Sequence, residues 1–425
     1  MTELPSGGEG GGSGTIRHGR LTSHHPIAAL VKFLGVALIV IVVSAVSVGG
    51  IAVWQVASSA KSTVPLLDQN GKTIAAPPDV GAIEGGVNLL LAGTDTRTNQ
   101  GGQFANKADQ ASSSGAGNND VTMLLHISQD HKSVTVVSIP RDLMVPIPAC
   151  PRAGGGTTGA TSSAMFNTSL SRGGLSCVVL TVEKMTGLTI PYAAEISFDG
   201  VIAMSNGIGG VDVCLATPLK DPYVQLDLPA GKQTIQGAQA LAFVRSRHGV
   251  GDGSDLGRIS NQQVFLSSLA RKVTTGGVLQ NPVQLFSLAR AAVSNMTLTD
   301  TLQNPTTLVT IGLALKNVGV ANMVFLQYPV SSDPANPNRV IAIASSANIL
   351  NAALVADKPV VLSGAVGRGA VLDPTATTAP VAPVPSATST VVPTTTPAPA
   401  STAVVLPSTI TGQNASQQTC SAKQK

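Results

Sequence analysis

Charged and aromatic residues are scarce in this chain of 425 residues. Asp, Glu, Lys and Arg together make up 11% of the sequence and Phe, Trp and Tyr only 3%, both well below typical usage in soluble domains. The formal net charge is +4 and no run of basic residues is present, which argues against a protein that binds nucleic acid. Because charges are rare, each cluster of arginines is informative.

Signatures of several large enzyme classes are also missing. The sequence contains no Walker A loop, no zinc motif and no G-x-S-x-G elbow. The four cysteines form no CxxC pair and have no histidine at metal-site spacing. His126 and His248 have no evident Ser or Cys nucleophile as a partner, so we interpret both as structural.

A long apolar run near the N-terminus predicts a membrane anchor. Residues 33–53 form a nearly uninterrupted run of about twenty apolar residues, long enough to cross a bilayer as a helix. Basic residues precede the run and Trp54 follows it, so residues 1–32 are predicted to be a disordered cytoplasmic tail and residues 33–54 the anchor. The alternative is a cleaved signal peptide, which the length of the run and the lack of a small-x-small cleavage site disfavour.

The rest of the chain divides by composition into a stalk, a globular domain and a tail. Residues 55–85 are polar and predicted to be a stalk, and residues 363–425 are rich in Pro and Thr and predicted to be disordered. Between them, residues 86–362 alternate short apolar runs with helical periodicity, which indicates an α/β domain. Strands are expected at 87–92, 121–127, 134–139, 211–215 and 322–328, and helices at 175–186, 198–208, 283–293, 306–317 and 344–356.

The most informative stretch covers residues 239–263. Its apolar residues 241–244 are few enough for a buried strand, and Arg245 and Arg247 follow it. Two residues apart on an extended chain, these arginines would point to the same face. A solvated edge is the alternative, but two arginines that close a buried segment in an arginine-poor chain favour a site.

A helix is expected to begin directly after this segment. Ser254 and Asp255 are favourable N-cap residues, and Arg258 and Gln262, four residues apart, share one face of the helix. At least three fixed positive charges therefore gather around a helix N-terminus. Such an arrangement suits an anion, and the oxygens of a pyrophosphate or phosphodiester fit it best.

Carboxylates occur at the ends of other predicted strands. Asp95 follows the strand at 87–92, Asp120 precedes the next strand, and Arg141 and Asp142 follow the third. Two such carboxylates could hold Mg²⁺, whose remaining ligands are commonly water and phosphate oxygens. The alternatives are that Asp95 and Asp120 only cap local structure and that Arg141 and Asp142 form an internal ion pair.

The redox state of the cysteines depends on the compartment, and an extracytoplasmic location of the domain permits disulfides. Cys150 and Cys177 bracket one loop, so a disulfide between them is predicted to fix that loop to the following helix. Cys214 lies in a predicted strand and is interpreted as a buried thiol, whereas the state of Cys420 in the tail stays open.

Several of these motifs, in this order, resemble the LytR-CpsA-Psr family of bacterial cell-envelope enzymes. The resemblance extends from about residue 86 to residue 329. It rests on NLLLAGTDTR (88–97), DVTMLLHI (120–127), VSIPRDLMVPIP (137–148), TVEKMTGLTIPYAAEISFDG (181–200), GGVDVCL (209–215) and LPAGKQTIQGAQALAFVRSRH followed by DLGRISNQQ.

The resemblance implies a three-layer α/β/α fold with a mixed central sheet and an apolar pocket for a polyprenyl chain. It also implies a membrane-anchored, extracytoplasmic phosphotransferase, which joins a glycopolymer from a polyprenyl-pyrophosphate carrier to peptidoglycan through a phosphodiester. A polyprenyl-pyrophosphate phosphatase and a non-catalytic regulator that binds envelope glycan or lipid are the alternatives.

The resemblance also assigns roles to single residues. Asp95 and Asp120 are expected to hold Mg²⁺. Pyrophosphate would be bound by Arg141, Arg245, Arg247, Arg258 and Gln262, with Asp255 beside them, and Arg97 matches an arginine of the family's motif. Asn118 and Asn261 stand where many relatives carry arginine or another basic residue, so one or two phosphate contacts are expected to be missing or to be supplied by residues elsewhere.

Overall fold

The computed structural model divides the chain into two compact units, Met1–Val53 and Trp54–Lys425. It describes residues 26–59, 63–77, 86–97, 100, 106, 110, 117–152, 154–278, 281–316, 318–376 and 402–423. The predicted N-terminal tail therefore lies largely outside the described residues.

Helix α1 spans Pro26–Ser59 and contains the predicted anchor, residues 33–54. Several of its large apolar side chains are exposed, among them Phe33 at 70% and Leu38 at 62%. Within the described part of the chain, no helix combines the length and the apolar character that crossing a membrane requires.

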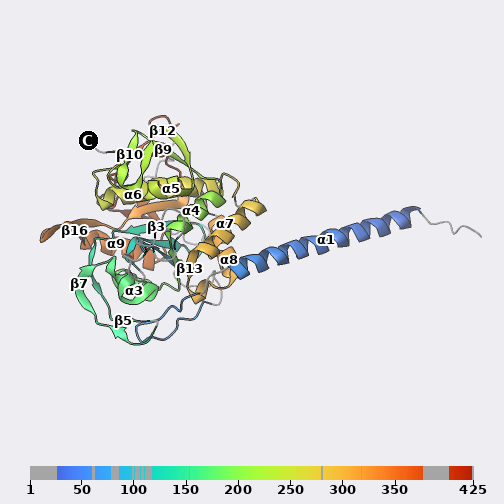
Figure 1. The fold of residues 1–425 in the computed structure, drawn as a ribbon, viewed down its shortest axis with the longest axis horizontal. Coiled ribbons are helices and arrows are strands. Elements are labelled where there is room, and N and C mark those ends of the chain that lie inside the picture. The colour runs from blue at the N-terminus through green and yellow to red at the C-terminus, as the bar shows by residue number, and fades with distance from the viewer. Residues whose placement is uncertain are drawn as a thin grey trace, which may run out of the picture. The chain divides into compact units, whose positions relative to one another are not determined.

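A mixed sheet of seven strands forms the centre of the second unit (Figure 1). Its strand order is β13-β8-β1-β2-β3-β14-β20. Strand β1 is parallel to β8 and β3 is parallel to β14, while the other neighbours are antiparallel. The strands are β1 (Val87–Thr94), β2 (Asn119–Ile127), β3 (Val134–Ile139), β8 (Tyr192–Ile196), β13 (Met296–Leu298), β14 (Met323–Gln327) and β20 (Gly412–Asn414). The mixed α/β fold expected from the sequence is thus confirmed.

Helices cover both faces of this sheet because apolar side chains alternate along its strands. On β2, Leu124 joins the core shared with α3 and α9, whereas Met123 joins the core shared with α7 and α8. The helices are α3 (Thr168–Thr186), α4 (Phe198–Gly207), α5 (Gly237–Arg245), α6 (Asp255–Thr274), α7 (Pro282–Asn295), α8 (Pro305–Lys316) and α9 (Ala344–Val355).

A second sheet adds a layer that the sequence did not predict. It has the order β12-β9-β21-β18 and lies on the side of α5 and α6 away from the central sheet (Figure 1). Its inward side chains, such as Val213, form a third core with Phe243 and Phe265. The strands are β9 (Val211–Leu215), β12 (Gly231–Ile235), β18 (Ala370–Leu372) and β21 (Thr419–Ser421). Helix α6 is consequently buried between two sheets.

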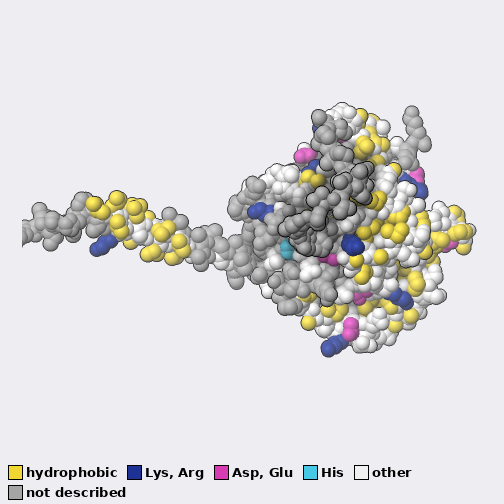
Figure 2. Space-filling model, turned by 180° about the vertical axis from the view of Figure 1, so that it is seen from behind, with side chains coloured by type: hydrophobic (Ala, Val, Ile, Leu, Met, Phe, Trp, Pro, Cys, Tyr) yellow, Lys and Arg dark blue, Asp and Glu magenta, His cyan; other side chains and the backbone are white. Residues whose placement is uncertain are grey.

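Short elements connect these layers. They are β4 (Met144–Ile147), β5 (Cys150–Pro151), β6 (Thr157–Thr158), β7 (Thr161–Met165), β10 (Leu219–Asp221), η2 (Pro222–Val224), β11 (Leu226–Leu228), η4 (Asp300–Leu302), η5 (Val320–Asn322), β15 (Val330–Asp333), β16 (Asn336–Ala342), β17 (Val360–Leu362) and β19 (Val404–Leu406). Figure 2 shows one face of the molecule, on which the described charged side chains are thinly scattered, as expected from the composition.

The predicted strand at residues 241–244 is wrong, because these residues belong to helix α5. A short apolar run does not distinguish a buried strand from a buried helix. Here Ala240, Leu241, Ala242 and Phe243 are all buried. Since α5 packs against α4, α6 and the short strand β11, its side chains are buried on more than one face and show no helical alternation.

The predicted disorder of residues 363–425 is wrong for residues 363–376 and 402–423, while residues 377–401 lie outside the described part. Strand β20 extends the edge of the central sheet, and β18 and β21 complete the second sheet. Leu406 and Ile410 are buried in the main core. Strands of three residues in a Pro/Thr-rich segment have no periodicity of their own, so only their partner strands define them.

The stalk prediction is also wrong for residues 63–77. Leu66 is fully buried in the main core, and Val64 forms a parallel bridge with Thr299. The hydroxyl of Ser176 accepts a hydrogen bond from the N–H of Leu67 (3.0 Å). This segment therefore begins the folded domain before residue 86.

All four cysteines form disulfides. Cys150 is joined to Cys177, the predicted pair, which links β5 to α3. Cys214 is joined to Cys420 and is not a free thiol. This second disulfide connects β9 to β21 and fixes the C-terminal segment to the second sheet.

Candidate active site

One edge of the central sheet gathers acidic and basic side chains. Strands β1 and β2 are antiparallel and Thr94 lies opposite Asn119, so the end of β1 meets the start of β2. Asp95 and Asp120 are therefore neighbours, and the end of the antiparallel strand β3 brings Arg141 to the same edge. All three line one cavity of about 880 Å³.

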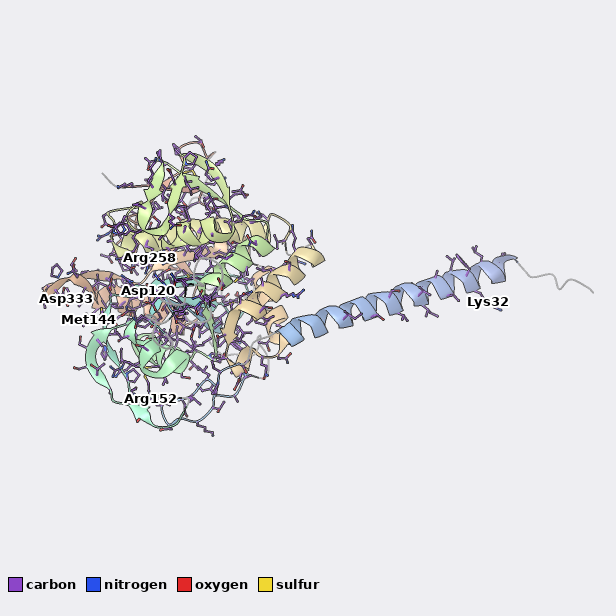
Figure 3. The ribbon with its side chains drawn as sticks, viewed as in Figure 1. Lys32, Asp120, Met144, Arg152, Arg258 and Asp333 are labelled. Atoms are coloured by element: carbon purple, nitrogen blue, oxygen red, sulfur yellow. A yellow bond between two sulfur atoms is a disulfide. The ribbon has the colours of Figure 1, made fainter. Side chains whose placement is uncertain are left out.

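Helices α5 and α6 provide the opposite wall of this cavity. Arg258 and Gln262 come from the first turns of α6, as predicted, and Ser254 caps the helix by accepting a hydrogen bond from Gly257 N–H (3.3 Å). Arg245 is the last residue of α5, and Arg247 follows it. The labelled side chains of Asp120 and Arg258 lie near each other between the central sheet and α6 (Figure 3).

Ion pairs connect the charged side chains at the sheet edge to those at the start of α6. Arg141 Nη1 lies 2.9 Å from both carboxylate oxygens of Asp120. Arg258 Nη2 donates to the backbone carbonyl of Asp120 (2.6 Å) and lies 2.6 Å from Asp255 Oδ1. The alternative pair of Arg141 with Asp142 is present as well, at 3.6 Å, so Arg141 serves both arrangements.

Two further arginines stand in an environment that disfavours their charge. Burial lowers the pKa of Arg245, and the nearby charge of Arg97 lowers it further. Burial also lowers the pKa of Arg247, with Arg141 and Arg258 adding repulsion. The charge of Asp120 offsets part of this effect at Arg245, and the charges of Asp255 and Asp142 do so at Arg247. A bound anion would compensate these buried cations further. The arrangement is therefore suited to a strongly charged anion.

The carboxylates suit a hard cation. Burial raises the pKa of Asp95, the N–H of Asn118 opposes this effect, and the adjacent charge of Asp120 raises the pKa further. That N–H lies 2.7 Å from Asp95 Oδ1. A divalent cation between the two aspartates would relieve their repulsion, and carboxylate oxygens are the ligands that Mg²⁺ prefers.

Beyond the charged residues, the same cavity is lined by apolar side chains. They come from the central sheet, from helices α4, α5, α6 and α7, and from the residue directly after α4. They are Leu91, Val121, Met123, Ile196, Val201, Met204, Ile208, Leu241, Val244, Phe265, Leu266, Leu269, Val273, Leu288 and Met296. The charged end and the apolar remainder together match an amphiphile with an anionic head group.

Three further residues considered in the sequence analysis are Arg97, Asp255 and Asn261. Arg97 lines the cavity, whereas Asp255 lies beneath the arginines, 3.5 Å from Arg141 Nε. Asn261 is fully buried, donates to the carbonyl of Phe243 (2.6 Å) and is not among the residues that line the cavity. Its position explains the lack of a basic residue there.

Asp221 is a residue of the site that the sequence analysis did not identify. Its carboxylate is 1% exposed and accepts hydrogen bonds from the backbone N–H groups of Arg247 and His248, both at 3.0 Å. It lies far from those residues in sequence. The only local signal is an aspartate before Pro222, which is typical of a helix start and says nothing about Arg247.

Together these features define an α/β protein with a cavity whose arginine-rich end continues into an apolar part. The family model described as the LytR_cpsA_psr family matches residues 52–353, and the chain belongs to this family. The resemblance inferred from the motifs is therefore confirmed.

Similar proteins come from several bacteria. The chain is 29% identical over 328 residues to the cell wall biosynthesis protein LcpA of Corynebacterium glutamicum, covering 72% of this chain and 61% of LcpA. It is 28% identical to the polyisoprenyl-teichoic acid–peptidoglycan teichoic acid transferase TagT of Bacillus subtilis, covering 58% of this chain and 69% of TagT. The chain thus spans less than two thirds of LcpA.

A solved structure agrees with the fold. A LytR-Csp2A-Psr enzyme from Actinomyces oris has a TM-score of 0.50 and 21% identity, and covers 69% of this chain and 96% of its own. This likeness supports the mixed α/β architecture described above.

Proposed function

We propose that this protein transfers a glycopolymer from a polyprenyl-pyrophosphate carrier to peptidoglycan and forms a phosphodiester link. The observation that carries the proposal is one cavity in which three aspartates and five arginines continue into an apolar lining. An isoprenoid chain fits the apolar part and a pyrophosphate fits the arginines. The name of the similar TagT, a polyisoprenyl-teichoic acid–peptidoglycan transferase, supports the same pair of substrates.

Each charged residue has a role in this proposal. Arg245, Arg247 and Arg258 bind the pyrophosphate oxygens and stabilise the charge that develops on the leaving group. Arg141, paired with Asp120, holds that carboxylate in place. Asp95 and Asp120 would hold Mg²⁺, which would supply further stabilisation of negative charge on the phosphates.

The reaction replaces one phosphorus–oxygen bond with another. The hydroxyl oxygen of the acceptor sugar forms a bond to the phosphorus that carries the glycan, and the bond from this phosphorus to the bridging oxygen breaks. Polyprenyl phosphate leaves with the electron pair of that bond, and the hydroxyl proton passes to a base or to solvent. The arginines bind both phosphates, so they hold the leaving group in line with the acceptor.

Membrane attachment with an extracytoplasmic catalytic domain is part of the same proposal. The apolar run at residues 33–53 and the exposed side chains of α1 support it. A polyprenyl donor resides in a membrane, so attachment would bring enzyme and donor together. Carbonate extraction of cell membranes should leave the full chain in the pellet, and release into the supernatant would contradict attachment.

The test uses the full chain in detergent with a synthetic polyprenyl-pyrophosphate saccharide, Mg²⁺ and a short peptidoglycan oligomer. Mass spectrometry should detect a phosphodiester-linked conjugate, whose formation falls at least about a hundredfold in Arg245→Ala and Asp95→Asn. Arg290→Ala, an exposed arginine outside the cavity, is the matched control. Saccharide phosphate without conjugate would instead indicate a phosphatase, and no turnover despite tight lipid binding would indicate a binding protein.

A further inference from the structure

An exposed aromatic pair lies at the same cavity. Two of the three tyrosines, Tyr192 and Tyr328, are buried, whereas Tyr223 is 77% exposed. Its ring stacks on that of His248, with centroids 4.2 Å apart and planes inclined by 31°. The side chain of His248 is itself 55% exposed. The pair therefore presents aromatic surface to solvent at the cavity.

The backbone that carries both rings is firmly held. The buried carboxylate of Asp221 accepts hydrogen bonds from the N–H groups of Tyr223 (3.2 Å) and His248 (3.0 Å). It also accepts from the hydroxyl of Ser246 (2.8 Å) and the N–H of Arg247 (3.0 Å). One side chain therefore fixes the aromatic pair and an arginine of the phosphate site relative to each other.

The position of the pair limits what it can bind. Tyr223 and His248 line the cavity together with Arg247, the residue before His248. The long apolar part of the cavity already provides for an isoprenoid chain. A group that lies against the exposed rings would therefore be attached to, or would approach, the phosphates on their solvent side.

We propose that Tyr223 and His248 form a stacking platform for a pyranose ring beside the reacting phosphate. This inference rests on the proposed function and names a sugar-binding subsite of the same site. The C–H face of a pyranose packs on an aromatic face, while its hydroxyl groups stay in water, and this suits exposed rings. The sugar is either the first residue of the donor glycan or the residue of peptidoglycan that carries the acceptor hydroxyl.

The first experiment compares two donor probes on the full chain, farnesyl pyrophosphate and farnesyl-pyrophosphate-linked N-acetylglucosamine. If the platform holds the donor sugar, Tyr223→Ala weakens binding of the sugar-bearing probe roughly three- to tenfold and changes binding of farnesyl pyrophosphate less than about twofold. Tyr223→Phe keeps the aromatic face and should bind both probes as the unchanged protein does. His248→Phe and His248→Ala provide the same comparison for the second ring.

The second experiment measures the KM for a peptidoglycan oligomer during turnover. If the platform holds the acceptor sugar, Tyr223→Ala raises this KM by a similar factor, leaves kcat nearly unchanged and binds both donor probes normally. Thermal melting of each variant checks the fold.

The outcomes distinguish failure of the stacking platform from failure of the proposed function. Equal weakening of both donor probes, or normal behaviour of Tyr223→Ala in every arm, overturns the platform while the proposed function stands. An unchanged protein that binds neither farnesyl probe overturns the proposed function, and the platform with it.

Discussion

At the scale of single residues, the buried carboxyl group of Glu195 on β8 leads to a prediction about how stability depends on pH, separate from catalysis. Burial raises the pKa of Glu195 from its ordinary value of 4.5 to about 7. The folded protein therefore binds a proton between these pH values, where the unfolded chain has released it. Stability must then fall as pH rises from about 4.5 to about 7, and the loss persists above that range.

Replacing Glu195 with glutamine should remove this loss. We expect Glu195→Gln to increase the free energy of unfolding at pH 7.5 by up to about 3 kcal/mol and to change it little at pH 4.5. Urea denaturation at pH 4.5, 6 and 7.5 measures the effect. Asp227→Asn, at an exposed carboxylate, is the control. A parallel pH dependence in Glu195→Gln and the unchanged protein would contradict the prediction.

Asp221 gives a second prediction at this scale, because it holds the backbone of Arg247. In Asp221→Asn an amide NH₂ replaces one carboxylate oxygen, so at least one buried donor loses its acceptor. The expected cost is about 1–3 kcal/mol of stability. Farnesyl pyrophosphate should also bind several-fold more weakly, and titration calorimetry measures both this affinity and that of the Asp227→Asn control. Unchanged affinity at full stability would show that Arg247 is held without Asp221.

Residues of the site differed in how far the sequence could predict them. Asp95, Asp120 and Arg141 lie at the ends of strands whose apolar runs are plain in the sequence, so their common edge was predictable. Asp221 depends on a contact across 26 residues of chain with Arg247, and no local pattern encodes it. The same holds for Asn261, whose partner Ser421 comes from the C-terminal segment.

At the scale of elements, the two helices of the site show where sequence patterns succeed. Helix α6 was predicted with its start, because Ser254 is a clear N-cap and the following side chains have helical spacing. Helix α5 was mistaken for a strand, because it is short and buried on more than one face. Burial by neighbouring layers removes the alternation on which such predictions depend.

The close packing around Gly200 leads to a prediction, and a second glycine in the same protein provides the control. A Cβ added at Gly200 in α4 would lie 2.8 Å from Ile196 Cγ1 and 3.0 Å from the carbonyl of Asn295, whereas one at Gly312 in α8 would meet nothing within 4 Å. Gly200→Ala should therefore lose about 1–3 kcal/mol through overpacking. Gly312→Ala should gain about 0.5–1 kcal/mol through helix propensity. Chemical denaturation of both variants decides the matter, and stabilisation by Gly200→Ala would show that α4 can move away from β8.

At the scale of the whole molecule, the sequence predicted the central layers and missed the closing segment. Strands β20 and β21 have three residues each, and their stability comes from β14 and β9. Gln413 donates to the carbonyl of Gln263 (2.6 Å), so this segment also supports the helix that carries Arg258 and Gln262. A disordered tail was the reasonable expectation, because composition alone does not reveal a partner strand.

The two disulfides allow the contribution of that segment to be measured. Cys214 and Cys420 are separated by 206 residues, and Cys150 and Cys177 by 27. In the chain-entropy model, loss of the longer link costs about 5 kcal/mol and loss of the shorter about 3.5 kcal/mol. Cys214→Ser with Cys420→Ser should thus be less stable in urea than Cys150→Ser with Cys177→Ser. It should still bind farnesyl pyrophosphate, because the strand pairings that support α6 do not require the sulfur link.

Deleting residues 402–425 removes the strands as well as the link. The edges of β14 and β9 lose their partners, the main core loses Leu406 and Ile410, and α6 loses its contact with Gln413. We therefore expect the deletion to cost more stability than the Cys214→Ser, Cys420→Ser pair and to abolish binding of farnesyl pyrophosphate. Urea denaturation and titration with that probe compare the two proteins directly. If they are equally stable and bind equally well, the segment contributes only through its disulfide, and its strands do not support the site.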